Sequence, residues 1–256
     1  MNKQNIKVEP VRIPFYSHKE DRKQLRIGLL ALSSDPTVEF DWRRMLNQDE
    51  VAFFVSRVAY EDVDNTENYW AIAEELTRAT SLLVPGTPLD VIAYGCTAGT
   101  VGVGVQEICD RILAARPGVP CATPITAACK GFKKLGVRRI ALLFPYPDEV
   151  AHTMREFLAS QDILVVRMAS FKVSSDWEKA LIPPEVICEA ALEIAGGDAE
   201  GVFISCTALK ATEAIETIES QLGKPVITSN QALLWESLRL AGYQKPIYGY
   251  GRLMQE

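Results

Sequence analysis

Short apolar runs alternate with longer amphipathic stretches along the chain from Arg26 onward. Apolar runs of strand length that are separated by helical patterns are typical of a parallel sheet flanked by helices. The runs that we interpret as buried strands are Ile27–Leu32, Val51–Val58, Val91–Tyr94, Ile140–Phe144, Ile163–Met168, Gly201–Ser205 and Pro225–Thr228. The pattern therefore predicts an α/β fold.

The stretches between these runs carry helix signals. One series of apolar residues recurs at the spacing of a single helix face; it consists of Ile72, Leu76, Ala79 and Leu83. Gly136 directly follows the periodic stretch 126–135, and a glycine commonly ends a helix because it adopts the left-handed conformation without a steric penalty. A last helix is predicted over 231–241.

The two halves of the chain repeat one plan. Arg26–Ala31 is echoed by Arg139–Phe144, Val91–Ala98 by Gly201–Ala208, and Val119–Thr123 by Lys224–Thr228, at offsets of 113, 110 and 105 residues. Three matches in the same order, with shared Cys-Thr-Ala and Pro positions, predict a duplicated lobe. We therefore expect two similar lobes, each a parallel sheet flanked by helices, related by a pseudo-twofold axis. Residues 1–124 with 229–256 are expected to form lobe one, and residues 125–228 lobe two.

Two of the six cysteines, Cys96 and Cys206, stand in the repeated Cys-Thr-Ala motifs at strand ends. Open α/β sheets bind ligands at the carboxyl ends of their strands, so the pseudo-twofold brings both thiols onto one cleft between the lobes. Each is expected between a strand and the helix after it. There, the helix dipole and free amides favour a thiolate and can hold a carboxylate or enolate oxygen. The threonine that follows each cysteine adds a hydroxyl donor.

Two thiols on opposite faces of a planar carbanion can remove and return a proton. Alternatively, one thiolate adds to an electron-poor double bond while the other thiol supplies a proton. Free cysteines more commonly behave as small buried hydrophobes. We keep that interpretation for the four cysteines that lie inside strand or helix patterns, which are Cys109, Cys121, Cys129 and Cys188.

Two further features have structural interpretations. The run Gly99–Gly104 has the spacing GxxGxG, which is not that of a dinucleotide-binding loop, and its small residues suit helix packing. His152 follows two acidic residues at the start of a predicted helix and is interpreted as a surface histidine.

Composition narrows the class of protein. A net charge of -6 argues against a nucleic-acid partner, because phosphate binding needs a basic face. No apolar run is long enough to span a membrane, and residues 1–24 lack the apolar core of a secretory signal. A cytoplasmic protein with a short N-terminal arm is therefore expected. With two histidines and no CxxC, we expect no metal.

Several motifs together resemble the Asp/Glu racemase superfamily, and within it the branch of maleate isomerases and arylmalonate decarboxylases. These motifs are Gly95–Ala98, Gly136–Ala141 leading to Pro145 and Tyr146, Ser205–Leu209, and Gly249–Leu253. The resemblance covers nearly the whole chain from Arg26. It is strongest to the ectoine-utilisation proteins of the branch, which have similar sequences at Cys96–Ala98 and Thr228–Trp235. It implies an enzyme without a cofactor and suggests a homo-oligomer.

The resemblance implies roles for individual residues. Cys96 matches the nucleophile or first acid/base of the isomerases, and Cys206 matches their second thiol. Tyr146 matches a tyrosine that hydrogen-bonds a substrate carboxylate. Positions whose amides or hydroxyls hold carboxylate or enolate oxygens are matched by Thr97, Ala98 and Thr207.

The loop Ser33–Thr37 also lines the site in relatives, which adds Ser34 and Asp35 to the candidate substrate-binding residues. Maleate isomerases resemble Ser-Ser-Asn at this point, whereas this chain has Asp35. A carboxylate there would repel a dianionic substrate or accept an ammonium group. Alternatively, Asp35 shapes the turn before Pro36.

Ala98 and Ala208 follow the two Cys-Thr pairs, where amino-acid racemases of the superfamily carry other residues, and the decarboxylases keep only the second cysteine. The resemblance thus favours an isomerase or racemase that acts on a small carboxylate through two facing cysteines, with maleate cis–trans isomerisation as the family default. The alternatives are an enzyme of ectoine or hydroxyectoine breakdown acting on a diaminobutyrate-like acid, an arylmalonate-type decarboxylase, and a non-catalytic module that binds small carboxylates.

Overall fold

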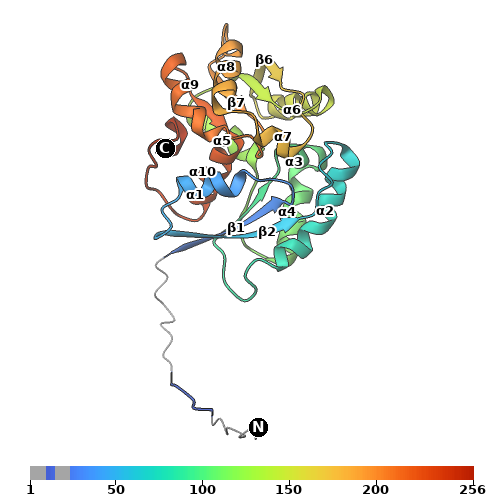
Figure 1. Cartoon of the computed structure of the whole chain (residues 1–256), viewed down its shortest axis with the longest axis vertical. Helices are drawn as coiled ribbons and strands as arrows, with labels where there is room; N and C mark the ends of the chain where they lie inside the picture. The colour runs from blue at the N-terminus through green and yellow to red at the C-terminus, as the bar shows by residue number, and fades with distance from the viewer. Residues whose placement is uncertain (1–9, 15–23) are drawn as a thin grey trace, which may run out of the picture.

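The strands form two parallel sheets of the same design in a computed structural model, which describes residues 10–14 and 24–256. One sheet has the order β2-β1-β3-β4 and the other β6-β5-β7-β8, so equivalent strands take equivalent places. The first sheet contains β1 (Leu25–Leu32), β2 (Val51–Val58), β3 (Val91–Gly95) and β4 (Cys121–Ala122). The second contains β5 (Arg139–Phe144), β6 (Leu164–Ser170), β7 (Gly201–Ile204) and β8 (Val226–Thr228). The predicted α/β fold of two similar lobes is confirmed (Figure 1).

Helices connect the parallel strands and cover the sheets. Around the first sheet these are α1 (Val38–Met45), α2 (Thr66–Ser81), α3 (Thr97–Val103) and α4 (Val105–Ala115), whereas α5 (Pro124–Lys134) packs against β8 of the second sheet. The rest are α6 (Asp148–Ser160), α7 (Asp176–Ala180), α8 (Pro184–Ile194), α9 (Ile215–Leu222) and α10 (Ser229–Leu240), with short 3₁₀ helices η1 (Thr212–Ala214) and η2 (Arg252–Gln255). Within the described ranges, no helix combines the length and apolar character that a membrane span requires.

All seven predicted strands are present, and the differences from the prediction are local. β4 is an eighth strand that the apolar pattern did not reveal, because it consists of two residues that pair only with β3. Leu83 lies beyond the end of α2 but is buried with the helix face that it was predicted to continue. Gly136 has a φ of 71° after α5, as expected of a glycine that follows a helix.

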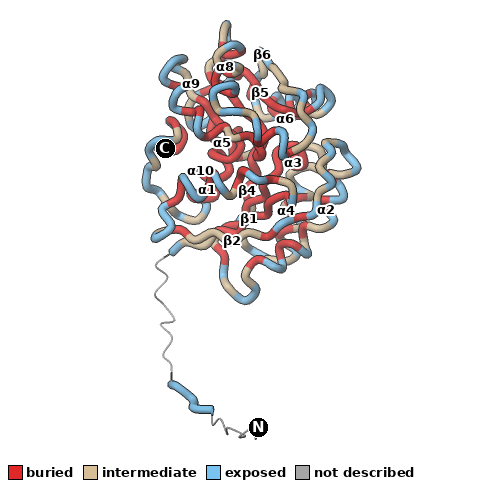
Figure 2. Tube along the Cα trace, viewed as in Figure 1, coloured by how far each residue is buried: buried red, intermediate tan, exposed pale blue. Residues whose placement is uncertain are grey.

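The apolar core lies between each sheet and its helices, and the tube of Figure 2 is red through the middle of both lobes. Helix α10 is buried from Ser229 to Leu238 because it contacts α1 and β3 of the first lobe as well as α5 and β8. It begins with a capping box, in which Thr228 and Gln231 hydrogen-bond each other's backbone amides. This cap fixes Ser229 at the point where the two lobes meet.

Two expectations about the ends of the lobes remain predictions. Most of the proposed N-terminal arm, residues 1–24, lies outside the residues that the structure describes. The division into 1–124 with 229–256 and 125–228 assigned the last helix to lobe one, whereas α10 contacts elements of both sheets.

Candidate active site

Cys96 occupies the position that the sequence predicts, between β3 and α3. It is the N-cap residue of α3, and its sulfur accepts a hydrogen bond from the Gly99 amide at 3.2 Å. The residue is 6% exposed, so its thiol has little contact with solvent. The end of β3 and the start of α3 therefore position Cys96, the first of the two predicted cysteines.

Cys206 follows β7, but the prediction of a helix directly after it was wrong. The chain turns through Thr207–Leu209, and regular helix begins only at η1 and α9. Cys206 has a φ of 131°, which is unfavourable for a residue with a β-carbon. Its amide donates to the Ser229 hydroxyl oxygen at 3.0 Å, which holds the strained backbone at the interface.

The two Cys-Thr motifs are hydrogen-bonded crosswise between the lobes. The hydroxyls of Thr97 and Ser229 are 2.8 Å apart, so Ser229 connects Thr97 to the amide of Cys206. The Thr207 hydroxyl donates to the carbonyl of Gly95, the residue before the other cysteine, at 3.2 Å. Both predicted threonine donors thus have partners in the protein. The role of Ala98 toward a substrate stays a prediction.

Burial dominates the electrostatics of both thiols, so the expectation of favoured thiolates is wrong for this structure. Burial raises the pKa of Cys96 well above its ordinary value, against the lowering effect of the Gly99 amide. Burial likewise raises the pKa of Cys206 to about 12, with Lys179 acting in the opposite direction. The carboxylates of Asp64 and Asp176 raise the pKa of both sulfurs. Both groups are therefore thiols at neutral pH.

A buried tyrosine stands beside each thiol. A methyl group added to Gly99 would lie 2.9 Å from the sulfur of Cys96 and 2.9 Å from the Tyr94 hydroxyl, which places that hydroxyl next to the thiol. Tyr146 is buried beside Cys206. Burial raises the pKa of both phenols, so both remain hydrogen-bond donors. Tyr146 was predicted; Tyr94 was not, although it lies two positions before Cys96 on the same side of the strand.

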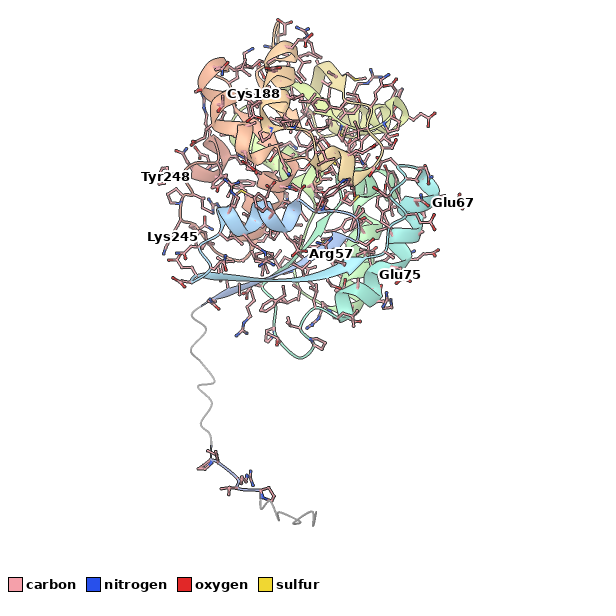
Figure 3. The ribbon with its side chains drawn as sticks, in the orientation of Figure 1. Arg57, Glu67, Glu75, Cys188, Lys245 and Tyr248 are labelled. Carbon is pink, nitrogen blue, oxygen red and sulfur yellow. The ribbon has the colours of Figure 1, made fainter. Side chains whose placement is uncertain are left out.

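Asp35 caps the first turn of α1. Its Oδ1 atom accepts hydrogen bonds from the amides of Thr37 at 2.7 Å and Val38 at 3.0 Å. Arg57 on β2, labelled in Figure 3, supports the same loop by donating to the carbonyls of Leu32 at 2.9 Å and Asp35 at 2.8 Å. This geometry fits the turn-shaping interpretation of Asp35, and its role toward a substrate stays a prediction.

Replacement of Asp35 by asparagine is expected to stabilise the protein at neutral pH. Burial raises the pKa of Asp35 from 3.8 to about 6, so the folded state keeps a proton that the unfolded chain has lost. The contribution of Asp35 to the free energy of unfolding is therefore greatest below pH 3.8 and decreases by about 3 kcal/mol as the pH rises to 6. Above pH 6 this loss is complete. An asparagine oxygen can still accept both amide bonds and carries no charge to desolvate.

Urea unfolding at a series of pH values measures this effect. We expect Asp35→Asn to be more stable than the wild type at pH 8 and equal to it near pH 4, and Asp49→Asn, at an exposed position, is the matched control. A loss of stability at every pH would contradict the effect of burial on this carboxyl.

An inter-lobe charged cluster adjoins the thiols, and sequence reasoning missed it. Lys179 of α7 contacts Asp64 at 2.9 Å and Asp176 at 3.1 Å, and Ser34 donates to Asp176 at 2.6 Å. Ser34 is thus in the interface as predicted, but its hydroxyl hydrogen is engaged by a carboxylate. Asp64 lies 115 residues from Lys179, and no local motif connects the two lobes' members of the cluster.

A cavity of about 540 Å³ opens beside this cluster. It runs between α2, α3 and α6, and its lining includes Asp64, Tyr69 and Ala98. Glu67 and Glu149 add two further carboxylates, and no lysine or arginine is among its lining residues. The cavity therefore offers an acidic approach to the interface that holds the thiols.

The other cysteines and His152 lie away from this interface. Cys129 and Cys188 are buried as predicted, and Figure 3 shows Cys188 on α8, toward the far end of the second lobe. Cys109 and Cys121 are half-buried and interact with each other at another cavity. His152 is exposed on α6, where it pairs with Glu156, as expected of a surface histidine.

The chain belongs to the arylmalonate decarboxylase family, whose profile matches residues 46–254. This membership confirms the branch of isomerases and decarboxylases that the motifs predicted.

Individual relatives come from both sides of that branch. An arylmalonate decarboxylase of Bordetella bronchiseptica is 36% identical over 143 residues, which is 54% of this chain and 59% of that protein. A maleate isomerase of Nocardia farcinica is 24% identical over 90% of this chain and 96% of its own length.

Solved structures of both kinds share the two-lobed fold. The maleate isomerase Iso of Pseudomonas putida S16 superimposes with a TM-score of 0.82 at 20% identity, over 91% of this chain and 99% of that one. A Nocardia farcinica maleate cis–trans isomerase mutant with a covalently bound succinylcysteine intermediate gives 0.82 at 21% identity, over 91% and 98%. Unliganded arylmalonate decarboxylase gives 0.72 at 26% identity, over 90% and 98%.

Proposed function

We propose that this protein is a cofactor-independent isomerase or racemase in which Cys96 and Cys206 act on one small carboxylate bound between the lobes. The observation that carries the proposal is the convergence of the two Cys-Thr motifs, which are joined through Ser229 and the Gly95 carbonyl. Both thiols also share Asp64 and Asp176 as charged neighbours. Such an arrangement places one acid/base on each side of a substrate.

Two reactions can use one sulfur on each side of the substrate, and in each of them every proton that is taken is given back. In racemisation, one sulfur, ionised first, takes the proton from the carbon next to the carboxylate, and the other thiol gives its proton to the opposite face. In cis–trans isomerisation, one thiolate forms a carbon–sulfur bond to the double bond and the other thiol protonates the neighbouring carbon. After rotation about the resulting single bond, the second sulfur takes the proton back from that carbon, the carbon–sulfur bond breaks, and the first sulfur leaves as a thiolate.

Maleate-like isomerisation is the reaction we favour. Maleate isomerases match this chain over nearly its whole length, and a relative carries a succinylcysteine, as expected of thiolate addition to maleate. Racemisation by proton transfer between the same two thiols remains the closest variant. A cytoplasmic location is proposed on the grounds of the sequence alone.

Arylmalonate-type decarboxylation is the second candidate, and the 36% identity over half of the chain favours it. One-sided protonation needs only one acid, whereas this interface holds two thiols, so we place it second. An enzyme of ectoine breakdown is a third candidate, supported by the motif resemblance and by the carboxyl group of Asp35, which suits an amine. A module that only binds carboxylates needs no matched thiols.

A screen of the wild-type protein tests the proposed function. The protein, dialysed against EDTA, is incubated with maleate, single enantiomers of small α-substituted acids, arylmalonates and diaminobutyrate, and the products are followed by ¹H NMR and chiral chromatography. We expect maleate or a chiral acid to be converted into its isomer without loss of carbon dioxide. Release of carbon dioxide from arylmalonates alone would favour the second candidate, and dependence on added metal would contradict the proposal.

A further inference from the structure

The strained turn after Cys206 is held by two consecutive residues of α10. The Cys206 amide donates to the Ser229 hydroxyl oxygen at 3.0 Å. The side-chain amide of Asn230 donates to the Thr207 carbonyl at 2.8 Å. The α-carbon of Cys206, where φ is 131°, therefore lies between two fixed peptide groups. A residue with a β-carbon keeps such a conformation only where its surroundings impose it.

Asn230 is itself fixed by α1. Its Nδ2 atom also donates to Oδ2 of Asp41 at 2.7 Å, and its backbone carbonyl accepts from the indole of Trp42 at 3.2 Å. Asp41 and Asn230 are each 1% exposed, so water does not compete for these bonds. Because α1 holds both the side chain and the backbone of Asn230, the donor that meets the Thr207 carbonyl has little freedom to move.

The two bonds of the Asn230 nitrogen explain why the side chain is an amide. The Thr207 carbonyl can only accept a hydrogen bond, so the atom that faces it is the nitrogen and not the oxygen of the side chain. An asparagine nitrogen carries two hydrogens, one for the carbonyl and one for Asp41. Aspartate at this position would set an oxygen against both acceptors, and a serine hydroxyl has one hydrogen only.

A third anchor completes the hold on the turn. The hydroxyl of Thr37, just before α1, donates to the Ala208 carbonyl at 2.8 Å. Cys96 needs no such anchors, because regular helix follows it and the Thr100 amide donates to its carbonyl at 3.2 Å. The backbone of Cys96 is thus fixed by its own helix, whereas that of Cys206 is fixed by side chains of α10 and of the segment that begins α1.

We propose that Asn230 is a positioning residue for Cys206, which holds the Thr207 carbonyl so that the cysteine keeps its strained backbone. A side chain leaves its α-carbon in a direction that the backbone sets. Release of the carbonyl would let Cys206 relax to an ordinary φ and would displace its sulfur. The catalytic meaning of this displacement rests on the proposed function, whereas the hold on the backbone exists without a substrate.

Selective ¹³C labelling of cysteine tests the hold without any turnover. The Cα and Cβ chemical shifts of a residue depend on its φ and ψ, so each of the six cysteines reports its own backbone conformation. Cysteine-to-serine variants assign the signals of the full-length protein. For Asn230→Ala, we expect the Cys206 signal to shift to the range of cysteines with negative φ, the Cys96 signal to move much less, and the Cys188 signal to stay.

Steady-state kinetics on a carboxylate that the wild type converts give the second measurement. For Asn230→Ala, kcat should fall by about 100-fold, as for a displacement near 1 Å in an active site. KM should change little, because both hydrogens of the Asn230 amide are used within the protein. Thermal unfolding confirms that the variant is folded at the assay temperature.

Two variants serve as controls. Ser237→Ala removes another buried polar group of α10, whose hydroxyl bonds the Leu233 carbonyl of the same helix at 2.6 Å, and should change neither the signals nor the kinetics. Asp41→Asn keeps an acceptor for Asn230 and should retain the wild-type Cys206 signal. Burial raises the pKa of Asp41 to about 7, so an uncharged group suits that position.

A folded Asn230→Ala variant with an unshifted Cys206 signal would overturn the inference, and so would a shifted signal with a wild-type kcat. If Asn230→Ala does not fold because it leaves the Asp41 carboxylate unpaired, the double variant with Asp41→Asn removes that charge and is judged by the same measurements. If the carboxylate screen is negative but the Cys206 signal shifts, the proposed reaction fails and the hold on Cys206 stands.

Discussion

Replacement of Cys96 or Cys206 by serine is expected to lower kcat/KM by roughly three orders of magnitude in each case. A serine hydroxyl is a far weaker acid and nucleophile than a thiol, so neither proton transfer nor addition to a double bond can proceed at a comparable rate. The loss should be specific to activity. Cys96 is a helix N-cap whose sulfur accepts a backbone hydrogen bond, and serine is among the preferred residues at that position.

Steady-state kinetics on whichever carboxylate the wild type converts, together with thermal unfolding, measures both parts of this expectation. Cys188→Ser is the matched control, because Cys188 is also buried but lies on α8 away from the interface (Figure 3). It should retain wild-type activity. If either serine variant at the interface kept full activity, the two-thiol mechanism would be wrong.

Gly99→Ala is expected to lower kcat/KM by about 100-fold or more, because a displacement near 1 Å in an active site has effects of this size. The added methyl would lie 2.9 Å from the Cys96 sulfur and 2.9 Å from the Tyr94 hydroxyl, and both groups are buried. One of them must move. Alanine favours a helix over glycine by about 1 kcal/mol, which offsets part of the steric cost to folding.

Gly196→Ala provides the control for Gly99→Ala. Its added methyl would meet only the flexible end of Arg167, so activity should be unchanged. Alkylation of Cys96 in Gly99→Ala gives a second measurement, since a displaced sulfur should react at an altered rate. An active Gly99→Ala enzyme with wild-type kinetics would show that the position of the Cys96 sulfur is not critical.

The repeat made most of the fold predictable. Apolar strands of a parallel sheet are buried on both faces and stand out as continuous runs, which is why β1, β2 and β5 were located within a residue or two. The duplicated Cys-Thr-Ala motif then indicated which strand ends face each other. β4 was missed because two residues are too short to form an apolar run.

The candidate site was predictable only where its residues belong to a motif. The repeat correctly predicted four residues at the interface, which are Cys96, Cys206, Thr97 and Thr207. It could not distinguish the strained turn after Cys206 from the helix start after Cys96, because both follow the same Cys-Thr-Ala sequence. The use of both threonine hydroxyls between the lobes depends on long-range contacts, which no spacing reveals.

The charges of the site were the least predictable part. The contact between Lys179 and Asp64 joins residues 115 positions apart on different lobes, and neither lies in a motif. The thiols were expected to be favoured as thiolates by helix amides, yet burial has the larger effect on both. Burial can be judged only once the lobes are packed, so sequence alone could not decide between these two effects.

The claim that both thiols act in one reaction is tested most directly by comparing kcat/KM for Cys96→Ser, Cys206→Ser and the double variant. Groups that act as a unit are not additive, so removal of the second should cost almost nothing once the first is gone. We expect all three variants to show the same large loss. Losses that multiply in the double variant, or near-wild-type activity in either single variant, would contradict a mechanism that needs both sulfurs.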